Sequence, residues 1–572
     1  MRSAPSTLER SQSLEISLEA VGSPVPGARP VRRLTAGVAA AGVFVGLVAL
    51  LYYASTRTLR ADSDAASTML QGISMSHGNL GLQGWRLSLD SFWLSDTVVF
   101  ALLVTLFGVK YQLMYLMPAV VAVVLVFLGM YLASAHRRRG AALAGALTVF
   151  ALIGLPSSFL ANKLLQSPVH VVTALWCLLS FMCLRRLRFD WYFVVGVILL
   201  AAATVSDLIG LAIGILPVFL AGLVAVARSR SIRVGVVPAA AAAAGALTAL
   251  ALRTLAGAGG WLEMTSRQRT ATMLQALKNV PLAFHYAVDM FGMGQSQQAR
   301  GHVPVPLQLA HLTAATVGVA VLVGVGRLAR GVTHGERLPA SRAGSGLATT
   351  GAPGAQDNFL DDVLLLATLG SLCSFLGLTV LSVPPEARYL LPAAIFASVL
   401  TGRFVASLAE RVRPSLTRKA LQGASIATVL AFAAGTGYQL SGRVPATPYP
   451  AIARFLAAHH LQSGLADYWT SAIVTIDSDD RVLVRPVGAV DGRIYPLVRD
   501  NSDVDWYRGV PFRYLVYAPG AMFRGVNKRA AERTWGHPAS VFRVAGYRIL
   551  VWARPFYFPK GLFPPGRSKS LL

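Results

Sequence analysis

The chain has 572 residues, of which 54% are hydrophobic and only 14% are charged. That balance excludes an ordinary soluble globular protein and indicates a polytopic membrane protein. The formal net charge of +26 would suit a nucleic-acid-binding protein, but the positions of the basic residues favour another explanation.

Apolar segments close to the length of a membrane-spanning helix recur along the chain. A helix needs roughly 20 residues to cross a bilayer, and we count about eleven such segments. They cover residues 34–54, 113–134, 139–156, 167–184, 190–206, 208–227, 233–256, 307–326, 359–381, 387–405 and 419–439. We therefore expect an α-helical polytopic membrane protein with about eleven transmembrane helices.

The basic residues lie in alternate loops. They precede the first segment and follow the second, fourth, sixth, eighth and tenth, as at residues 137–139, 185–188 and 228–233. The positive-inside rule places these loops and the N-terminus in the cytoplasm, and an odd number of spans leaves the C-terminus outside. The charge is therefore an orientation signal, with the lipid bilayer and no nucleic acid as the expected partner. The expected location is a bacterial cytoplasmic (inner) membrane.

One outer segment tests this scheme. Residues 97–109 are apolar but too short to span, so we assign them to a non-spanning helix of the first outer loop. If they crossed the membrane, every later basic loop would lie outside, against the positive-inside rule. In the second outer loop we expect a helix from Met264 to Val288, broken at Pro281.

Three regions follow from the composition. Residues 1–33 are rich in Ser, Pro and Arg and predict a disordered cytoplasmic tail. Residues 34–440 form the transmembrane domain, with long outer loops at about 55–112 and 257–306. Residues 441–572 predict a small α/β extracytoplasmic domain that opens with a helix near Tyr449. Its β-rich segments are residues 472–476, 481–487, 513–517 and 547–552. A Gly/Ala/Ser/Thr-rich stretch at 340–357 predicts a flexible cytoplasmic loop.

Acidic residues stand at the start of the first outer loop. Asp62 and Asp64 lie within ten residues after the first apolar segment. Carboxylates at a membrane edge are costly to desolvate and are more often functional than structural. The same loop also contains His77, Asn79, Asp90 and Asp96. The chain has no Walker A loop, Rossmann glycine pattern, HExxH or paired CxxC, so energy coupling through ATP is not supported.

The spacing of Asp64, Met75, Gly78 and Asn79, with the Phe-Gly-Val at 107–109, resembles the first outer loop of the GT-C superfamily. These membrane glycosyltransferases use polyprenyl-phosphate-linked sugars and include the aminoarabinose and protein O-mannosyl transferases. Two features depart from that pattern. Ala65 stands where the superfamily usually has a second acid, and a Pro-Pro pair before the short helix is missing.

A second element supports the same resemblance. Arg388 and Tyr389 open a sequence that ends at Pro392, similar to the Arg-Tyr-x-x-Pro element of the superfamily. The resemblance implies a sugar transfer to an acceptor on the outer face, with inversion. Asp64 is the predicted general base, with Asp62 as neighbour or substitute. Arg388 is predicted to hold the donor phosphate, because a guanidinium can bind two oxygens, and Tyr389 to position sugar or phosphate.

Further candidates lie nearby in the predicted topology. Lys163 and His170 flank the turn between the third and fourth spans and could reach the donor site, and Asp207 could face the same cavity. The acceptor-side candidates are Asp90, Asp96, His77 and Asn79. In the C-terminal domain, aromatic side chains could stack on sugars, although core packing is the better explanation. These are Tyr468, Trp469, Trp506 and Tyr507.

Each candidate also has an ordinary structural explanation. Asp62 and Asp64 could cap a helix that begins near Ala65, and Arg388 could be an interfacial anchor. The two carboxylates could also bind a divalent cation, although two such ligands alone are weak evidence; no other cofactor is expected.

Two rivals from other classes stay open. One is a transporter or flippase of lipid-linked glycans, which would usually show internal repeats and ionisable residues in mid-membrane. The other is a non-catalytic scaffold that kept the fold. In the enzyme interpretation the partners are a polyprenyl-phosphate sugar donor and a lipid, glycan or protein acceptor.

Overall fold

The structure is a computed structural model of the whole chain. It describes residues 28–59, 62–88, 90–264, 269–291, 314–334, 353–379, 386–411, 415–441, 447–498, 501–520 and 525–559. The chain divides into two compact units, residues 1–47 and 48–572. The described part of the first unit is the beginning of helix α1 (Ala28–Thr58), so the predicted tail of residues 1–33 ends too late. Pro30 does not prevent this, because the first turn of a helix tolerates proline.

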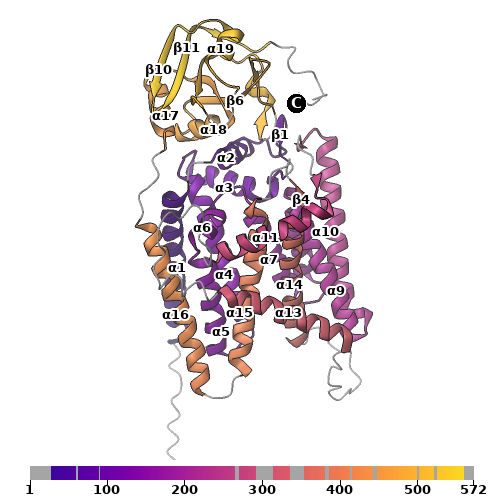
Figure 1. Cartoon of the computed structure of the whole chain (residues 1–572). Coiled ribbons are helices and arrows are strands. Elements are labelled where there is room, and N and C mark those ends of the chain that lie inside the picture. Colours follow the sequence, from indigo (N-terminus) through magenta and orange to yellow (C-terminus); the bar gives the residue numbers. More distant parts are fainter. Residues whose placement is uncertain are drawn as a thin grey trace, which may run out of the picture. The chain divides into compact units, whose positions relative to one another are not determined.

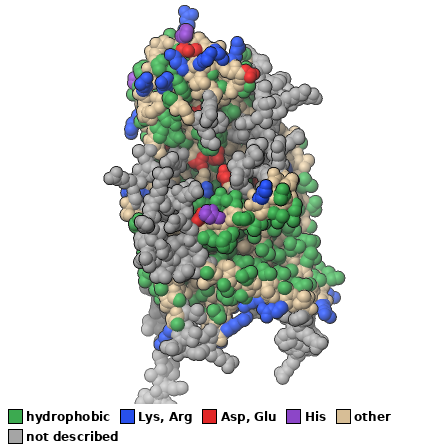
Figure 2. All heavy atoms as spheres, viewed as in Figure 1, with side chains coloured by type: hydrophobic (Ala, Val, Ile, Leu, Met, Phe, Trp, Pro, Cys, Tyr) green, Lys and Arg blue, Asp and Glu red, His purple; other side chains and the backbone are tan. Residues whose placement is uncertain are grey.

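A helix stands at each of the eleven predicted spans. Within the described ranges, seven helices are long and apolar enough to cross a membrane, and shorter apolar helices accompany them. Besides α1, the helices at these positions are α4 (Leu113–Ser134), α5 (Arg139–Val149), α7 (Val171–Leu184), α8 (Trp191–Ser206), α9 (Leu216–Ser229), α10 (Ile232–Ala258), α13 (Ala314–His334), α14 (Pro353–Gly377), α15 (Leu391–Arg411) and α16 (Ser415–Leu440). Figure 2 shows a broad hydrophobic surface over these helices, with Lys and Arg side chains gathered at one end. The chain is a multi-pass membrane protein.

Small residues allow the helices of the second unit to pack closely. Helix α15 packs against α5 and α14, α9 against α10, and α7 against α8 (Figure 1). A Cβ added to Gly402 on α15 would lie 2.8 Å from the carbonyl oxygen of Gly145 on α5. The two backbones therefore touch, as is common where membrane helices pack through glycine and alanine.

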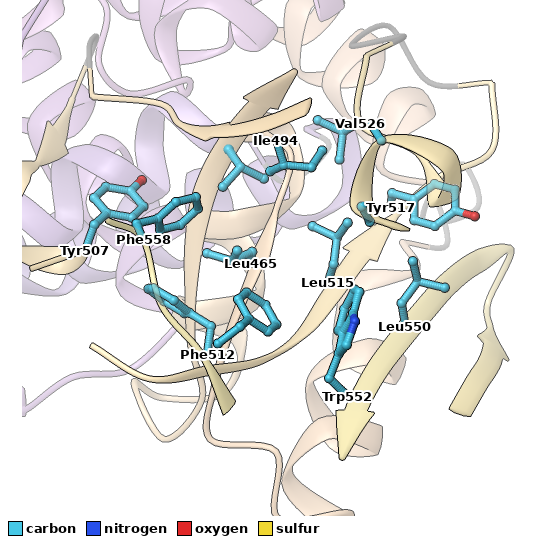
Figure 3. Packing of buried hydrophobic residues seen from close by; sticks show 14 residues of the cluster. Leu465, Ile494, Tyr507, Phe512, Leu515, Tyr517, Val526, Leu550, Trp552 and Phe558 are labelled. Atoms are coloured by element: carbon cyan, nitrogen blue, oxygen red, sulfur yellow. The ribbon is translucent and has the colours of Figure 1, made fainter. Parts of the chain in front are cut away.

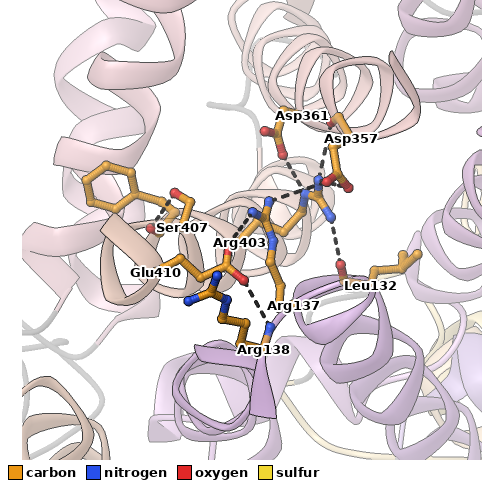
Figure 4. Close-up of polar contacts among 9 residues, drawn as sticks. Leu132, Arg137, Arg138, Asp357, Asp361, Arg403, Ser407 and Glu410 are labelled. Atoms are coloured by element: carbon orange, nitrogen blue, oxygen red, sulfur yellow. Dashed lines mark hydrogen bonds and ion pairs between the residues drawn. The ribbon is translucent and has the colours of Figure 1, made fainter. Parts of the chain in front are cut away.

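An ionic network around the buried Arg403 joins α14, α15 and the connection between α4 and α5 (Figure 4). The guanidinium of Arg403, which is 1% exposed, binds Asp361, Asp357 at 3.1 Å and the carbonyl oxygen of Leu132 at 2.9 Å. Arg137 pairs with Glu410 at 3.0 Å. The flexible loop predicted at residues 340–357 ends too late, since α14 begins at Pro353. Asp357 and Asp361 extend this helix because they have cationic partners nearby. Residues 340–352 lie outside the described residues.

Short elements surround the outer ends of the predicted spans. The first outer loop contains α2 (Ser63–Ser76), β1 (Trp85–Leu87), a π-helical turn η1 (Trp93–Thr97) and α3 (Val98–Phe107), and α2 packs on α3. Other short elements are π-helical turns η2 (Phe150–Gly154) and η3 (Leu211–Ile215), α6 (Ser158–Leu164), β2 (Glu263–Met264), β3 (Arg269–Thr270), β4 (Leu378–Thr379) and the 3-10 turn η4 (Ala387–Leu390). The predicted short helix at residues 97–109 is confirmed as a ten-residue helix, α3.

The predicted helix of the second outer loop is wrong in its start and in its break. Helix α11 (Met273–Met290) begins nine residues later than predicted, where Thr272 and Gln275 form a capping box, and it continues through Pro281. Proline removes only one backbone donor, and packing against α14 and α6 keeps the helix intact.

The C-terminal part of the second unit is an α/β sheet domain. Its helices are α17 (Tyr449–Ala458), α18 (Tyr468–Asp477) and α19 (Lys528–Trp535), with a 3-10 turn η5 (Val504–Trp506). Its strands are β5 (Ser463–Ala466), β6 (Leu483–Val490), β7 (Arg493–Pro496), β8 (Ser502–Asp503), β9 (Phe512–Tyr517), β10 (Ser540–Val544) and β11 (Tyr547–Phe556). Six of them form one sheet in the order β10-β11-β9-β5-β6-β7, in which β5 is parallel to both β6 and β9. The predicted helix near Tyr449 is confirmed.

The sheet domain has its own hydrophobic core. Leu465, Phe512, Leu515, Leu550 and Trp552 are buried together beneath α19 (Figure 3). Three of the four predicted β-rich segments are strands, but residues 472–476 form part of helix α18. This apolar run is buried between α2 and β6, and a short buried run does not distinguish a helix from a strand.

Candidate functional site

Asp62 is the N-cap of α2. Its Oδ1 accepts a 3.0 Å hydrogen bond from the backbone N–H of Asp64, which is the ordinary capping role of an aspartate. Its Oδ2 accepts a hydrogen bond from Nε2 of Gln166, in the loop after α6. Both carboxylate oxygens of Asp62 therefore have partners, and the structural explanation considered for this residue is the one observed.

Asp64 lies in the first turn of α2 and faces the sheet domain. Its Oδ1 accepts a 2.6 Å hydrogen bond from the hydroxyl of Tyr468, at the start of α18. Burial and the charge of Asp62 raise the pKa of Asp64 from 3.8 to about 6, while the Tyr468 hydrogen bond and Arg388 oppose this rise. At neutral pH the carboxylate is mostly ionised, yet it is a stronger base than an ordinary aspartate.

Arg388 lies on η4, where the chain enters α15. Its Nε is 3.4 Å from a carboxylate oxygen of Glu386, and its guanidinium carbon is 5.4 Å from the ring centroid of Tyr389. The charge of Arg388 interacts with those of Asp64 and Asp90, so one cation serves two acids from the first outer loop. The predicted base and the predicted phosphate ligand thus lie near each other.

Lys163 on α6 adds a second cation to this region. Its charge interacts with those of Glu386, Arg388 and Asp62, and burial lowers the pKa of its ammonium group. A partly buried lysine next to an arginine is a suitable ligand for a phosphate group.

His170, Asp207 and Asp90 form a second cluster, in addition to the group of acids and cations around Asp64 and Arg388. Nδ1 of His170 is 2.6 Å from Oδ2 of Asp207, and the two side chains are 2% and 1% exposed. Thr173 donates a 2.8 Å hydrogen bond to the same oxygen. Burial and Asp207 raise the pKa of Asp90 to about 6.

A cavity lies next to this cluster. Its volume is about 220 Å³, and its lining includes Asp90, Asp207, Ser374 and Tyr389. The ring of Tyr389 is 4.8 Å from the ring of His170, centroid to centroid. Tyr389 therefore connects the cavity to Arg388, its neighbour in the chain, and the cavity can admit a polar group of modest size.

A divalent cation fits the second cluster better than the Asp62 and Asp64 pair. One ligand atom each from Asp90, His170 and Asp207 lies within 4.8 Å of the others. Asp207, however, already accepts hydrogen bonds on both oxygens, and the charge of Arg388 interacts with that of Asp90. The three side chains could hold an ion, and they also satisfy one another without one.

Asp96 lies in η1 and is 2% exposed. Its Oδ1 accepts a 2.9 Å hydrogen bond from the hydroxyl of Ser167, in the loop that leads to His170. Burial raises the pKa of Asp96 to about 7. This residue borders the second cluster, since its pKa responds to the charges of His170 and Asp207.

The predicted candidates His77 and Asn79 lie at the other end of α2. His77 is the C-cap of this 14-residue helix, which places it roughly 20 Å along the axis from Asp64. Asn79 donates hydrogen bonds to Ser74 and Gln83 and accepts one from Gln83. Their contacts are those of a loop, and the structure does not bring them to the two clusters.

The sequence did not predict the hydrogen bond from Tyr468 to Asp64 or the one from Gln166 to Asp62. The aromatic ring of Tyr468 suggests only sugar stacking or core packing, and no local signal joins this residue to Asp64. Glu386 was visible beside the Arg-Tyr-x-x-Pro element, and its position before Arg388 could have identified it.

No protein-family model matches the chain, and no curated protein matches it in sequence. Solved structures do. ArnT from Cupriavidus metallidurans in the apo state is 11% identical and covers 90% of this chain and 98% of its own, with a TM-score of 0.49. The same protein bound to undecaprenyl phosphate is 12% identical and covers 89% of this chain and 97% of its own, with a TM-score of 0.48. The Archaeoglobus fulgidus oligosaccharyltransferase, tethered with an acceptor peptide, is 11% identical and covers 83% of this chain and 68% of its own, with a TM-score of 0.42.

Proposed function

We propose that the chain is a membrane glycosyltransferase that moves a sugar from a polyprenyl-phosphate-linked donor to an acceptor on the extracytoplasmic face. The donor would enter from the bilayer of a bacterial cytoplasmic membrane. The proposal rests on this chain's own residues, and it agrees with the resemblance of its first outer loop to the GT-C superfamily.

One observation carries the proposal: the charge of Arg388 interacts with that of Asp64, although the two residues come from opposite halves of the chain. Glycosyl transfer needs a base for the acceptor hydroxyl and a cation for the leaving phosphate, close to one sugar carbon. An acid with a raised pKa beside an arginine and a lysine meets both needs.

In the proposed step, a carboxylate oxygen of Asp64 accepts the proton of the acceptor hydroxyl while the oxygen of that hydroxyl attacks the anomeric carbon. The bond between this carbon and the phosphate oxygen breaks, and polyprenyl phosphate leaves with the electron pair. Arg388 and Lys163 stabilise the charge on the departing phosphate. Attack opposite the leaving group inverts the anomeric carbon.

The second cluster and the cavity beside it are the proposed binding site of the transferred sugar. Tyr389 joins Arg388 to the cavity lined by Asp90 and Asp207, which are hydrogen-bond acceptors for sugar hydroxyls. We assign Asp90, Tyr389 and His170 to sugar binding or orientation, while a cation at Asp90, His170 and Asp207 is the alternative use of the same side chains.

The test replaces Asp64 with Asn in the full-length protein. A strain that lacks the gene is complemented with each variant, and its envelope glycans and polyprenyl-phosphate-linked sugars are measured. We expect Asp64→Asn to restore less than about 1% of the lost glycan, because a general base contributes about 10²–10⁴-fold. The donor should accumulate at the same time.

The matched control is Asp505→Asn, the same change at a carboxylate that is 66% exposed and paired with Arg508. It should restore the glycan fully. Full restoration by Asp64→Asn would exclude the catalytic role and favour the scaffold. A lost glycan with the donor retained on the cytoplasmic side would favour the flippase.

A further inference from the structure

The sheet domain holds α2 by three side-chain hydrogen bonds. Oγ of Ser63 donates to the carbonyl oxygen of Tyr468 at 2.8 Å, and the hydroxyl of Tyr468 donates to Oδ1 of Asp64 at 2.6 Å. Nε2 of Gln71, two turns further along, donates to Oδ1 of Asn501 at 3.0 Å. Helix α18 also packs along α2. The candidate base therefore lies on a helix to which the C-terminal domain is hydrogen-bonded at the first turn and in the middle.

The docking of the sheet domain on the first outer loop does not depend on the Tyr468 hydroxyl. Strand β8 pairs with β1, with Ser502 opposite Arg86, and the N–H of Asn501 donates to the carbonyl oxygen of Arg86 at 2.7 Å. The rings of Trp85 and Trp506 meet edge to face at 5.0 Å. Removal of one hydroxyl should therefore leave the sheet domain docked.

We propose that the C-terminal domain is part of the catalytic apparatus and that Tyr468 is the positioning residue for Asp64. The inference rests on the proposed role of Asp64 as base. Tyr468 fixes the carboxylate by its Oδ1 and so presents Oδ2, which accepts no hydrogen bond from the described residues, to the acceptor hydroxyl. A base held within about 0.5 Å of its working position accelerates the reaction far more than a mobile base does.

The same hydrogen bond sets the proton affinity of the base. Asp64 is surrounded by Asp62 from the N-cap, Glu386 and Arg388 from the segment before α15, and Tyr468 from α18. Asp62 and Glu386 raise the pKa of Asp64, while Arg388 and Tyr468 lower it. Without the phenol, burial and the two acids would raise the pKa of Asp64 further, and a smaller fraction would be ionised at neutral pH.

The test is Tyr468→Phe, which removes the hydroxyl and keeps the ring. The full-length protein is placed in lipid vesicles, and the infrared C=O band of its protonated carboxylic acids is followed with pH. The part of the band that Asp64→Asn abolishes identifies Asp64. We expect its midpoint to rise by about one pH unit in Tyr468→Phe, since a hydrogen bond to a charged group is worth about 1.5–3 kcal/mol, or roughly one to two pK units.

The matched control is Tyr514→Phe. Tyr514 is fully buried in β9 of the same domain, and its hydroxyl has no hydrogen-bond partner among the described residues. This variant should titrate as the unaltered protein does. An unchanged midpoint in Tyr468→Phe, or a lower one, would overturn the inference.

Two further arms keep the outcome clear. If Tyr468→Phe does not fold, a fluorinated tyrosine at position 468 is a stronger donor and should lower the midpoint; no change would contradict the inference. If Asp64→Asn restores the glycan, the proposed function fails. If Asp64→Asn is inactive while the midpoint ignores the Tyr468 hydroxyl, only the inference about Tyr468 fails.

Discussion

The hydroxyl of Tyr468 lies 2.6 Å from Oδ1 of Asp64, although 404 positions separate the two residues in the chain. The first turn after the first predicted span thus meets the first turn of α18 in the sheet domain. The predicted boundary between residues 440 and 441 does not separate two compact units, since residues 48–572 form one. The site is consequently a product of both halves of the second unit.

Two variants of Asp62 distinguish a helix-capping role from a catalytic role. Asp62→Asn keeps an oxygen that can cap α2 and should reduce activity less than fivefold. Asp62→Ala removes the cap and should lower the free energy of unfolding by about 1 kcal/mol. Thermal unfolding and glycan restoration measure the two effects. A loss of activity in Asp62→Asn as large as that in Asp64→Asn would assign the base role to both acids.

Arg388 should not be replaceable by lysine. Arg388→Lys keeps the charge but loses the planar fork that binds two phosphate oxygens, so we expect turnover of the lipid donor to fall about 10²-fold. Arg508→Lys, at a side chain that is 57% exposed, is the matched control and should be unaffected. Near-normal turnover by Arg388→Lys would indicate an interfacial anchor instead of a phosphate ligand.

Asp96 should limit stability at neutral and alkaline pH. Its pKa is raised from 3.8 to about 7, so ionisation is harder in the folded state than in the unfolded chain. Its contribution to stability is therefore complete below about pH 3.8 and is lost as the pH rises through about 7.

Asp96→Asn mimics the protonated acid and keeps an acceptor for Ser167. The variant should be more stable than the unaltered protein by on the order of 2 kcal/mol at pH 8, with no gain at pH 3.5. Thermal unfolding at a series of pH values measures this difference. A gain that does not vary with pH would show that ionisation is not its cause.

Arg403 should be a structural residue. It is 1% exposed and binds two acids on α14 that are 24% and 32% exposed (Figure 4), so Arg403→Gln removes the buried cation that both carboxylates share. We expect a loss of about 2–3 kcal/mol, because breaking a fully buried pair costs about 3–5 kcal/mol and water reaches these carboxylates. Arg508→Gln, at an exposed pair, should change the free energy of unfolding by no more than about 0.5 kcal/mol. Equal unfolding temperatures for the two variants would contradict this account.

Divalent cations should not be required for turnover. The oxygens of Asp207 already accept hydrogen bonds from Thr173 and the backbone N–H of Ile209, and His170 and Arg388 supply positive charge. We expect activity of the full-length protein to survive EDTA within about twofold. Suppose instead that EDTA removes the activity, that Mg²⁺ or Mn²⁺ restores it, and that the His170→Gln variant does not respond to either ion. That result would establish a cation at this cluster.

Local patterns were enough for the helices at the eleven predicted spans and for two residues of the candidate site. Each apolar run has a helix within the described residues, because a backbone inside a bilayer must satisfy its own hydrogen bonds. Asp64 and Arg388 were identifiable from their places at the outer ends of spans. The start of α11 and the helix α18 were not, since capping at Thr272 and burial of residues 472–476 against α2 depend on neighbours.

The sequence by itself determined that this is a helical multi-pass membrane protein and which charged residues stand where the spans end. Hydropathy and charge act locally, so a one-dimensional pattern carries them. Only the tertiary structure decided that Tyr468 bonds Asp64, that Asp62 is occupied as a cap, and that His77 lies at the far end of α2. Hydrogen bonds of 2.6–3.0 Å require faces from distant segments to dock, and no local pattern specifies which faces meet.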